Sequence, residues 1–427
     1  MRFGLLVRLL GLAVLLVLPG CAAVKPPIEA RREIPRIRVG LEVGAEAVTV
    51  SGTGMLQIAI KDSPRKPKMC GPGEKWTFIA SSSPELGNGL EVIDPDGLSR
   101  GVMDAVFVVA VVEAESFLTL GGRRYRGSFE VFRDSSGKLT LVNVLNVESY
   151  LRGVVPNEIG SSSPETMEAV KAQAVAARTY TFFFAGRYAT KGFDALPTVQ
   201  DQVYTGVDGE RPLSDRAIAE TYGVVLTYRG KPIRTNYFST CGGATAAIEE
   251  VWPFDPLPYL KSVSDRRGLR GEGYCSESSN YRWTEVWTVE QFEAIFRKYY
   301  STQYATAVQP RVGERIVNVK IAERSGSGRV RKLEIVTTDN VYRLTGDAIR
   351  LVIRRPNPEG AILRSTLFDV DVQREGGYAR TIIFSGGGNG HGVGMCQMGA
   401  IGMARRGKRV HEILTYYYRG VKLSRAY

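Results

Sequence analysis

Short hydrophobic runs separated by turn residues dominate the first third of the chain. They lie at Ile37–Val43, Ala47–Val50, Leu56–Ile60, Trp76–Ile79 and Val106–Val112. β-branched runs bounded by Gly, Pro and polar residues predict strands, so residues 36–132 are expected to be β-rich, with an irregular stretch over 61–104. Residues 127–144 predict a hairpin, because two further runs flank the polar turn Asp134–Lys138.

A different pattern over residues 164–188 predicts one long helix. Serines precede Pro164, and Glu165 follows it, which is the composition expected at a helix N-terminus. The interior, Met167–Ala185, is rich in alanine and apolar on most sides. A helix without a clear polar face is expected to be central and buried.

The remaining pattern mixes strands with shorter helices. Strands are predicted at Val224–Tyr228, Ile233–Phe238, Val317–Ile321, Lys332–Thr337 and Thr381–Ser385, and helices at Val289–Tyr299, Gly394–Arg406 and Val410–Tyr418. Residues 284–372 are interpreted as an inserted or second lobe, between core residues 133–283 and 373–427. The predicted fold class is therefore α+β: a β-rich, multi-lobed protein with a central buried Ala-rich helix and a substrate cleft.

The N-terminus carries a secretion signal. Residues 1–20 combine Arg2 and Arg8 with an apolar run over Leu9–Leu18 that is too short for a stable bilayer span. A short uncleaved anchor is the alternative. The sequence Leu-Pro-Gly-Cys ending at Cys21 resembles the lipobox of bacterial lipoproteins, which implies lipidation of Cys21. Ala22 implies outer-membrane sorting in a diderm host, and residues 21–35 are interpreted as a tether.

Charge and histidine content narrow the function classes. The 427 residues carry a net charge of +12, which falls to +10 without residues 1–20, because these hold two arginines and no acids. An exported basic protein suits anionic wall polymers or lipid headgroups, and nucleic acid is not an expected partner. The chain has two histidines, so a three-histidine zinc site is excluded, and five cysteines leave only a mixed site open. We predict no metal and no cofactor.

Glu158 is the leading candidate for acid catalysis. It follows Pro156 and lies among Val154, Val155 and Ile159. A carboxylate held among apolar neighbours has its charged form disfavoured, as a general acid at neutral pH requires. A surface glutamate that merely flanks a helix is the alternative interpretation.

Two cations lie on the predicted central helix. Lys171 and Arg178 are seven residues apart, and therefore on one face. Cations on a buried helix must be paired or functional. They are expected either to contact substrate or to pair with acids such as Glu158.

The glycine-rich stretch 385–400 holds His391, Cys396 and Gln397. Seven glycines in sixteen positions indicate a backbone that passes close to another group. His391 with Cys396 is compatible with a Cys–His amidase or peptidase, and a packed glycine loop is the alternative. Cys241 and Cys275 are a possible disulfide in an oxidising compartment, while Cys70 and Cys396 are left over and the connectivity stays open.

Several ordered motifs together resemble the stage II sporulation protein D (SpoIID)/LytB family. They are VESYLRGVVPNEI at 147–159, EAVKAQAVAARTY at 168–180, DQVYTGV at 201–207, YFSTCGGAT at 237–245, PYLKSV at 258–263, GNGHGVGMCQMGAIGMA at 388–404 and EILTYYYRGVKL at 412–423. The resemblance spans about 127–265 and 381–423, and it makes 133–283 and 373–427 a SpoIID-like core.

The resemblance implies peptidoglycan metabolism. One branch of the family contains lytic transglycosylases that prefer peptide-stripped glycan strands, and another contains amidase enhancers. Glu158 matches the catalytic acid. Arg178, Tyr259 and Tyr417 match family positions, and the predicted substrate-binding residues are completed by Lys171, Tyr204, His391 and Gln397. Some members hold zinc through cysteines and histidines, but no histidine lies near Cys241, so that site is not carried over. Cys396 replaces the usual serine.

A single carboxylate is sufficient for this chemistry. Hydrolytic glycosidases use two carboxyl groups, whereas a lytic transglycosylase uses the C6 hydroxyl of the sugar in place of water. We expect cleavage to 1,6-anhydroMurNAc ends by Glu158, on an extracytoplasmic lipoprotein anchored to the membrane. A non-catalytic peptidoglycan-binding activator of a cell-wall amidase is the alternative function.

Overall fold

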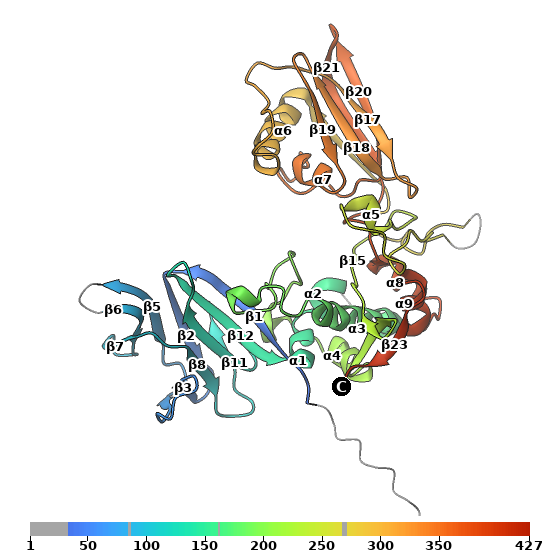
Figure 1. Ribbon diagram of the computed structural model, residues 1–427. Coiled ribbons are helices and arrows are strands. Elements are labelled where there is room, and N and C mark those ends of the chain that lie inside the picture. The colour runs from blue at the N-terminus through green and yellow to red at the C-terminus, as the bar shows by residue number, and fades with distance from the viewer. Residues whose placement is uncertain (1–32, 84–86, 161–162, 267–270) are drawn as a thin grey trace, which may run out of the picture. The chain divides into compact units, whose positions relative to one another are not determined.

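The computed structural model describes residues 33–83, 87–160, 163–266 and 271–427 (Figure 1). The predicted signal peptide, the predicted lipidation site Cys21 and nearly all of the predicted tether lie outside these residues. The fold is a mixed α+β structure with more strand than helix and several sheets, which confirms the predicted class. No helix in the described ranges is both long enough and apolar enough to cross a membrane.

Two six-stranded sheets make up the N-terminal part. Their orders are β1-β12-β11-β8-β3-β4 and β10-β9-β2-β5-β6-β7, and among the described residues every strand pair in them is antiparallel. The strands are β1 (Arg36–Ala45), β2 (Ala47–Gly52), β3 (Leu56–Ile60), β4 (Lys68–Cys70), β5 (Trp76–Ser83), β6 (Gly87–Ile93), β7 (Ser99–Met103), β8 (Phe107–Val111), β9 (Leu118–Leu120), β10 (Arg123–Tyr125), β11 (Ser128–Arg133) and β12 (Leu139–Asn146).

The predicted hairpin over 127–144 is confirmed as β11 and β12. Asp134 closes its turn, because its carboxylate accepts the backbone N–H groups of Ser136 and Lys138. The stretch over 61–104, expected to be irregular, holds β4 to β7, and of these strands the sequence predicted β5 alone, as Trp76–Ile79. Glycines in β6 hide the usual alternation there, and pairing with neighbouring strands supplies the order that the local pattern lacks.

The central part surrounds one buried helix. Its elements are α1 (Val147–Arg152), α2 (Val155–Ile159), α3 (Met167–Phe183), α4 (Pro212–Glu220), β13 (Val224–Tyr228), β14 (Lys231–Pro232), β15 (Tyr237–Phe238), α5 (Ile248–Val251), β22 (Met395–Cys396), α8 (Gln397–Ala404), α9 (Val410–Tyr417) and β23 (Lys422–Arg425). Helix α3 contacts α4, α8, α9 and β13 (Figure 1), and ten of its residues are buried.

The long helix begins and ends differently from its prediction. A 3-10 turn over Pro164–Thr166 precedes α3, and the α-helix ends at Phe183 rather than Tyr188. Gly186, with a φ of 77°, follows this end. The strand predicted over Ile233–Phe238 is reduced to β15, which pairs in parallel with β22 and so joins two distant segments.

A second hydrophobic core is built from residues between Trp283 and Phe384. It is formed by β16 (Trp283–Thr288), α6 (Val289–Gln303), β17 (Ile316–Arg324), β18 (Val330–Thr337), β19 (Val341–Thr345), α7 (Ala348–Val352), β20 (Phe368–Glu375) and β21 (Tyr378–Gly386). Two three-stranded sheets, β16-β21-β20 and β17-β18-β19, supply the strands. In β16 alternate residues are buried, because one face of the strand covers this core.

Candidate active site

Glu158 lies on the short helix α2, whose first turn also contains Pro156. Its side chain is partly buried, and its Oε1 accepts the backbone N–H of Val203 at 2.9 Å. Burial raises the pKa of Glu158 to about 7, and the Val203 hydrogen bond opposes this rise only in part. The carboxyl group can therefore be protonated near neutral pH and still ionise.

Glu158 opens into a cavity of about 510 Å³. The cavity is lined by Glu158, Tyr180, Phe184, Arg187, Val199, Gln200, Asp201, Val203, Arg234, Asn236, Tyr237, Phe238, Ser239, Trp252, Phe254, Gly390, His391 and Gln397. These residues come from α2, α3, the loop around 200, the segment through β15, the end of α5 and the glycine-rich loop. The size suits a small part of a polar polymer.

One wall of the cavity combines aromatic rings with a guanidinium group. The Arg234 guanidinium carbon lies 4.5 Å from the ring centre of Phe254 and 5.5 Å from those of Trp252 and Phe184. Nε of Arg234 donates to Asn236 at 2.9 Å. Among the described residues no carboxylate lies within ion-pair distance of Arg234, so its charge stays available to a ligand.

A second carboxylate of the cavity is already engaged. Asp201 pairs with Arg187 at 2.6 Å and accepts the backbone N–H of Leu196 at 2.9 Å. Its side chain is 1% exposed. Asp201 is thus fixed as a structural partner of Arg187 and of the loop backbone.

Two of the predicted substrate-binding residues, His391 and Gln397, line the cavity. Nδ1 of His391 accepts the Val393 N–H. Its Nε2 donates to the Tyr237 carbonyl oxygen at 3.1 Å. Burial lowers the pKa of His391 to about 4. The imidazole is therefore neutral at physiological pH, and its position is set by backbone groups.

Arg178 is placed away from Glu158. Its side chain is completely buried and forms two hydrogen bonds of 2.8 Å with the Glu148 carboxylate, and it also donates to the Val224 carbonyl at 3.1 Å. From the sequence, Arg178 was expected either to contact substrate or to pair with acids such as Glu158. In the structure Arg178 forms an ion pair, and its partner is Glu148. Arg178 is not among the residues that line the cavity.

Lys171, Tyr204 and Tyr259 are likewise engaged elsewhere. Lys171 pairs with Glu168 and Glu220, each at 2.7 Å. Tyr204 is buried and donates its hydroxyl to Asn143 at 2.8 Å. Tyr259 is 8% exposed and packs its ring 5.6 Å from that of Tyr228. None of the three lines the cavity, so they support its surroundings.

Tyr417 and the central cysteines form a separate buried group. The Tyr417 hydroxyl donates to Asp265 at 2.7 Å. Cys241 and Cys275 are free thiols whose sulfur atoms lie 3.4 Å apart, so the disulfide considered from the sequence is not formed. Cys70 is a free, buried cysteine in β4, apart from this group.

The Cys–His dyad considered from the sequence is not assembled either. Both ring nitrogens of His391 are occupied by backbone groups. The Cys396 sulfur is buried and accepts the backbone N–H groups of Cys241 and Gly399, each at 3.2 Å. The structure therefore gives no support to a cysteine nucleophile activated by His391.

The sequence reasoning missed much of the cavity wall. No recognisable spacing in the sequence links Arg234, Trp252 and Phe254. The tryptophan and the phenylalanine, on either side of Pro253, resemble ordinary core residues in the sequence. Arg187 and Asp201 were not predicted as cavity residues either, although Asp201 is the first residue of the DQVYTGV motif. Their common position at one cavity is a result of tertiary folding.

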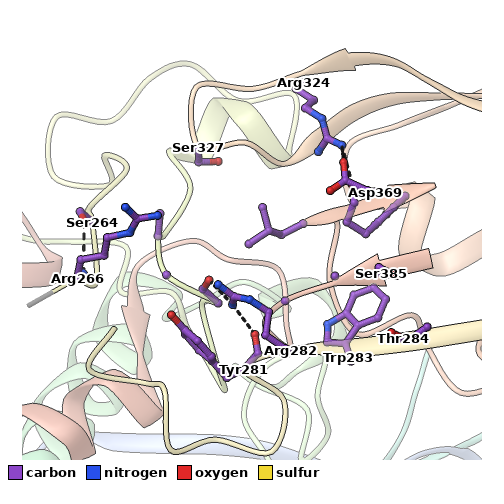
Figure 2. A pocket seen from close by; sticks show the side chains of 17 residues that line it. Ser264, Arg266, Tyr281, Arg282, Trp283, Thr284, Arg324, Ser327, Asp369 and Ser385 are labelled. Carbon is purple, nitrogen blue, oxygen red and sulfur yellow. Dashed lines mark hydrogen bonds and ion pairs between the residues drawn. The ribbon is translucent and has the colours of Figure 1, made fainter. Parts of the chain in front are cut away.

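A second, larger cavity of about 940 Å³ lies between the loop through Gly242 and the ends of β17, β20 and β21. Figure 2 shows Arg324 directed at Asp369, with which it forms an ion pair, and Arg282 at nearby carbonyl groups. Among the described residues that line it, Asp369 is the one carboxylate. This cavity therefore lacks an unengaged acid comparable to Glu158.

Comparison of the sequence with known proteins places this chain in a family. Residues 135–228 match the family model described as "Stage II sporulation protein", and residues 267–394 match "Domain of unknown function (DUF8618)". An uncharacterized protein of Brachyspira hyodysenteriae is 33% identical over 73% of this chain and 76% of its own length.

Two named relatives add to this match. The Stage II sporulation protein D of Bacillus amyloliquefaciens is 33% identical over 70% of this chain and 79% of its own length. The amidase enhancer of Bacillus subtilis is 28% identical over 64% of this chain and 40% of its own length. The chain therefore belongs to the SpoIID/LytB family, as its motifs predicted.

Some members of this family hold zinc near the cleft through cysteines and histidines. The cavity around Glu158 does not fit such a site. The described residues that line it include one histidine, whose two nitrogens are engaged, and no cysteine. We derive no catalytic step through a metal ion.

Proposed function

We propose that this protein cleaves the glycan strands of peptidoglycan by a lytic transglycosylase reaction at Glu158. The observation that carries the proposal is a partly buried glutamate with a pKa of about 7 that faces a 510 Å³ cavity. A general acid works best when its pKa lies near the working pH. Membership of the SpoIID/LytB family fits a cell-wall role.

The reaction needs one group that first gives and then takes a proton. Protonated Glu158 donates to the glycosidic oxygen between MurNAc and GlcNAc as the bond from C1 of MurNAc to that oxygen breaks. The GlcNAc leaves with a hydroxyl group. The Glu158 carboxylate then accepts the C6 hydroxyl proton as O6 bonds to C1. The products are a 1,6-anhydroMurNAc end and regenerated Glu158, with no water consumed.

The state of Asp201 favours this route over hydrolysis. A hydrolytic glycosidase needs a second carboxyl group as base or nucleophile. Asp201 is the other carboxylate that lines the cavity, and Arg187 and the Leu196 backbone hold it. An intramolecular nucleophile removes the requirement for a second free acid.

The aromatic and cationic wall supports a choice of substrate. Trp252 and Phe254 offer flat apolar faces for sugar rings. Arg234 offers a guanidinium group without a carboxylate partner in the described chain. When the peptide stem is removed, the lactyl group of MurNAc ends in a free carboxylate, which a guanidinium binds well. Peptide-stripped glycan is therefore the proposed substrate, held in a cleft that includes this cavity.

We also propose that the protein acts outside the cytoplasm. The secretion signal over residues 1–20 and the lipobox-like Cys21 carry this part, and both lie outside the described residues. A lipid on Cys21 would anchor the basic protein to a membrane facing the anionic wall. Mass analysis of the mature N-terminus, with Cys21→Ser as control, tests the anchor.

A non-catalytic activator of a cell-wall amidase is the second candidate. The relative named amidase enhancer favours it. An activator would stimulate its partner amidase unchanged with Glu158→Ala, provided that the variant folds. Circular dichroism of the variant supplies this check on folding.

The deciding experiment is digestion of purified peptide-stripped glycan strands, followed by mass analysis of the new ends. The wild type is expected to give anhydro ends, and Glu158→Gln to give none. Glu165→Gln is the matched control, because Glu165 is exposed and lies outside the cavity. Equal product from the wild type and Glu158→Gln, or reducing ends in place of anhydro ends, would reject the mechanism.

A further inference from the structure

Four potential metal ligands meet at one buried point away from the Glu158 cavity. Cys241, Asp265, Cys275 and Cys396 each direct one ligand atom to a group in which all four atoms lie within 4.8 Å of one another. All four residues are buried. None of them lines the Glu158 cavity. We propose that this cluster, the Cys3Asp site, binds one divalent zinc ion with a structural role.

The ligand chemistry and spacing fit zinc. Zinc takes four ligands in structural sites and binds thiolate and carboxylate groups. Tetrahedral zinc with Zn–S bonds of about 2.3 Å places two thiolates about 3.8 Å apart. The sulfur atoms of Cys241 and Cys275 are 3.4 Å apart, closer to this spacing than to the bond of about 2.05 Å in a disulfide.

Backbone N–H groups are directed at two sulfur atoms of the cluster. The Cys396 sulfur accepts two backbone N–H groups, those of Cys241 and Gly399, at 3.2 Å each. The Cys241 sulfur accepts the Gly243 N–H at 3.4 Å. Such N–H groups occupy part of the lone-pair space of each sulfur atom and help to fix its position.

The carboxylate ligand is oriented from two sides. Asp265 accepts the Cys275 backbone N–H at 2.9 Å through Oδ2. It also accepts the Tyr417 hydroxyl at 2.7 Å through Oδ1. Hydrogen bonds of this kind fix the direction of a metal-binding carboxylate. Tyr417, predicted to bind substrate, is thus placed as an orienting residue of the Cys3Asp site.

A buried arginine supplies the second, independent observation. Arg329 is 1% exposed, and its Nε and Nη1 have no hydrogen-bond partner. Its Nη2 donates to the Cys241 carbonyl at 3.0 Å, and its charge interacts with Cys241, Cys396 and the Glu250 carboxylate, which lies beyond ion-pair distance. Among the described residues no carboxylate pairs with Arg329. A buried cation requires a compensating anion, and three thiolates and a carboxylate around a divalent ion carry two net negative charges.

This ligand set contains no histidine, so it is not the cysteine–histidine site of some relatives. It joins the loop through Cys241, the segment from Asp265 to Cys275 and the end of the glycine-rich loop. Ser239 and Gln397, which line the Glu158 cavity, lie next to two of these segments. The zinc would therefore hold part of that wall, but the inference does not depend on the proposed glycan cleavage.

Metal content of the purified full-length chain tests the proposal. Prepared under reducing conditions, the wild type should hold about one zinc ion per chain. Cys275→Ser and Cys396→Ser should lose most of it under a chelator that leaves the wild type loaded. Cys70→Ser should match the wild type, because Cys70 is the described cysteine outside the cluster.

Cobalt substitution gives a readout independent of activity. Co²⁺ added to the metal-free chain should produce a sulfur-to-metal charge-transfer band that weakens in Cys396→Ser. This variant restores the serine usual in the family, so it is expected to fold. The proposal is overturned if the reduced wild type takes up neither Zn²⁺ nor Co²⁺, or if Cys275→Ser and Cys396→Ser retain zinc as well as Cys70→Ser. A Cys241–Cys275 disulfide in the metal-free purified protein would also overturn it.

Discussion

The Glu158 carboxylate accepts the backbone N–H of Val203 at 2.9 Å, although the two residues are 45 positions apart. This hydrogen bond fixes the acid against the loop that carries Asp201. A hydrogen bond to a carboxylate favours its charged form. Burial outweighs that effect and raises the pKa of Glu158 to about 7. The site therefore joins fixed geometry to a proton that can be exchanged near neutral pH.

Cleavage of peptide-stripped glycan should depend on pH through Glu158. The acid must be protonated, so kcat/KM should be highest below about pH 7 and fall as the pH rises through that value. His391, with a pKa of about 4, should contribute no change between pH 5 and 8. A pH profile of initial rates measures this, and a rate that increases through pH 7 would contradict the assignment.

The stability of the folded protein should carry the same signature. Between the ordinary pKa of 4.5 and about 7, folded Glu158 holds more protons than the unfolded chain, so the free energy of unfolding falls as the pH rises across this window. Glu158→Gln removes the penalty for burying charge. It should be more stable than the wild type by up to about 3 kcal/mol at pH 8, and the gain should vanish near pH 4.

Denaturant unfolding of both proteins at pH 4 and pH 8 provides this measurement. Glu165→Gln is the control, because Glu165 is exposed and its substitution should change stability little at either pH. A gain from Glu158→Gln that is equal at the two pH values would show that its origin is not ionisation.

Breaking the Arg178–Glu148 pair should destabilise the fold. Arg178 is fully buried, so Arg178→Met leaves the Glu148 carboxylate without its main partner. A loss of about 3–5 kcal/mol in the free energy of unfolding is expected. The control Arg216→Met removes an exposed pair with Glu220 and should change stability little.

The same variant separates a structural from a substrate-binding role. At a temperature where Arg178→Met is still folded, KM for peptide-stripped glycan should be close to that of the wild type. A raised KM in a variant of wild-type stability would instead return Arg178 to the substrate site.

Arg234→Met should weaken binding of peptide-stripped glycan. Removal of the guanidinium group that we propose to bind the lactyl carboxylate should raise KM about tenfold, which corresponds to ~1.4 kcal/mol. Binding of strands that keep their stems should change little, because their lactyl group is an amide. Arg380→Met, exposed on β21, is the control. Equal effects on both kinds of strand would contradict this role.

The strands and helices of strong periodicity were predictable from sequence. β13 and β3 match their predicted bounds, and α9 differs from its prediction by one residue. The length of α3 and the strands β4, β6 and β7 were not, because helix ends and strand pairing depend on contacts with distant residues. The inserted lobe was expected over 284–372, and the second core draws on Trp283 to Phe384.

In the candidate site, too, local features were predictable from the sequence and long-range contacts were not. Local neighbours alone indicated that Glu158 has a raised pKa, since apolar residues surround it in the chain and burial follows from them. The ion-pair partners of the cations could not be predicted from the sequence. Arg178 pairs with Glu148 on α1, thirty positions earlier, and no local sequence pattern specifies that partner. The cysteines illustrate the same limit, because an oxidising compartment suggested a Cys241–Cys275 pair, whereas folding also brings Asp265 and Cys396 to these two residues.

By itself, the sequence determined the family, the α+β class and the acid of the candidate site, because motifs, periodicity and local burial are properties of neighbouring residues. Only the tertiary structure decided which groups share a cavity with Glu158, which cations are engaged, and where three cysteines and an aspartate converge. These depend on segments far apart in the chain, such as β15 and β22, whose pairing brings residues about 160 positions apart into contact.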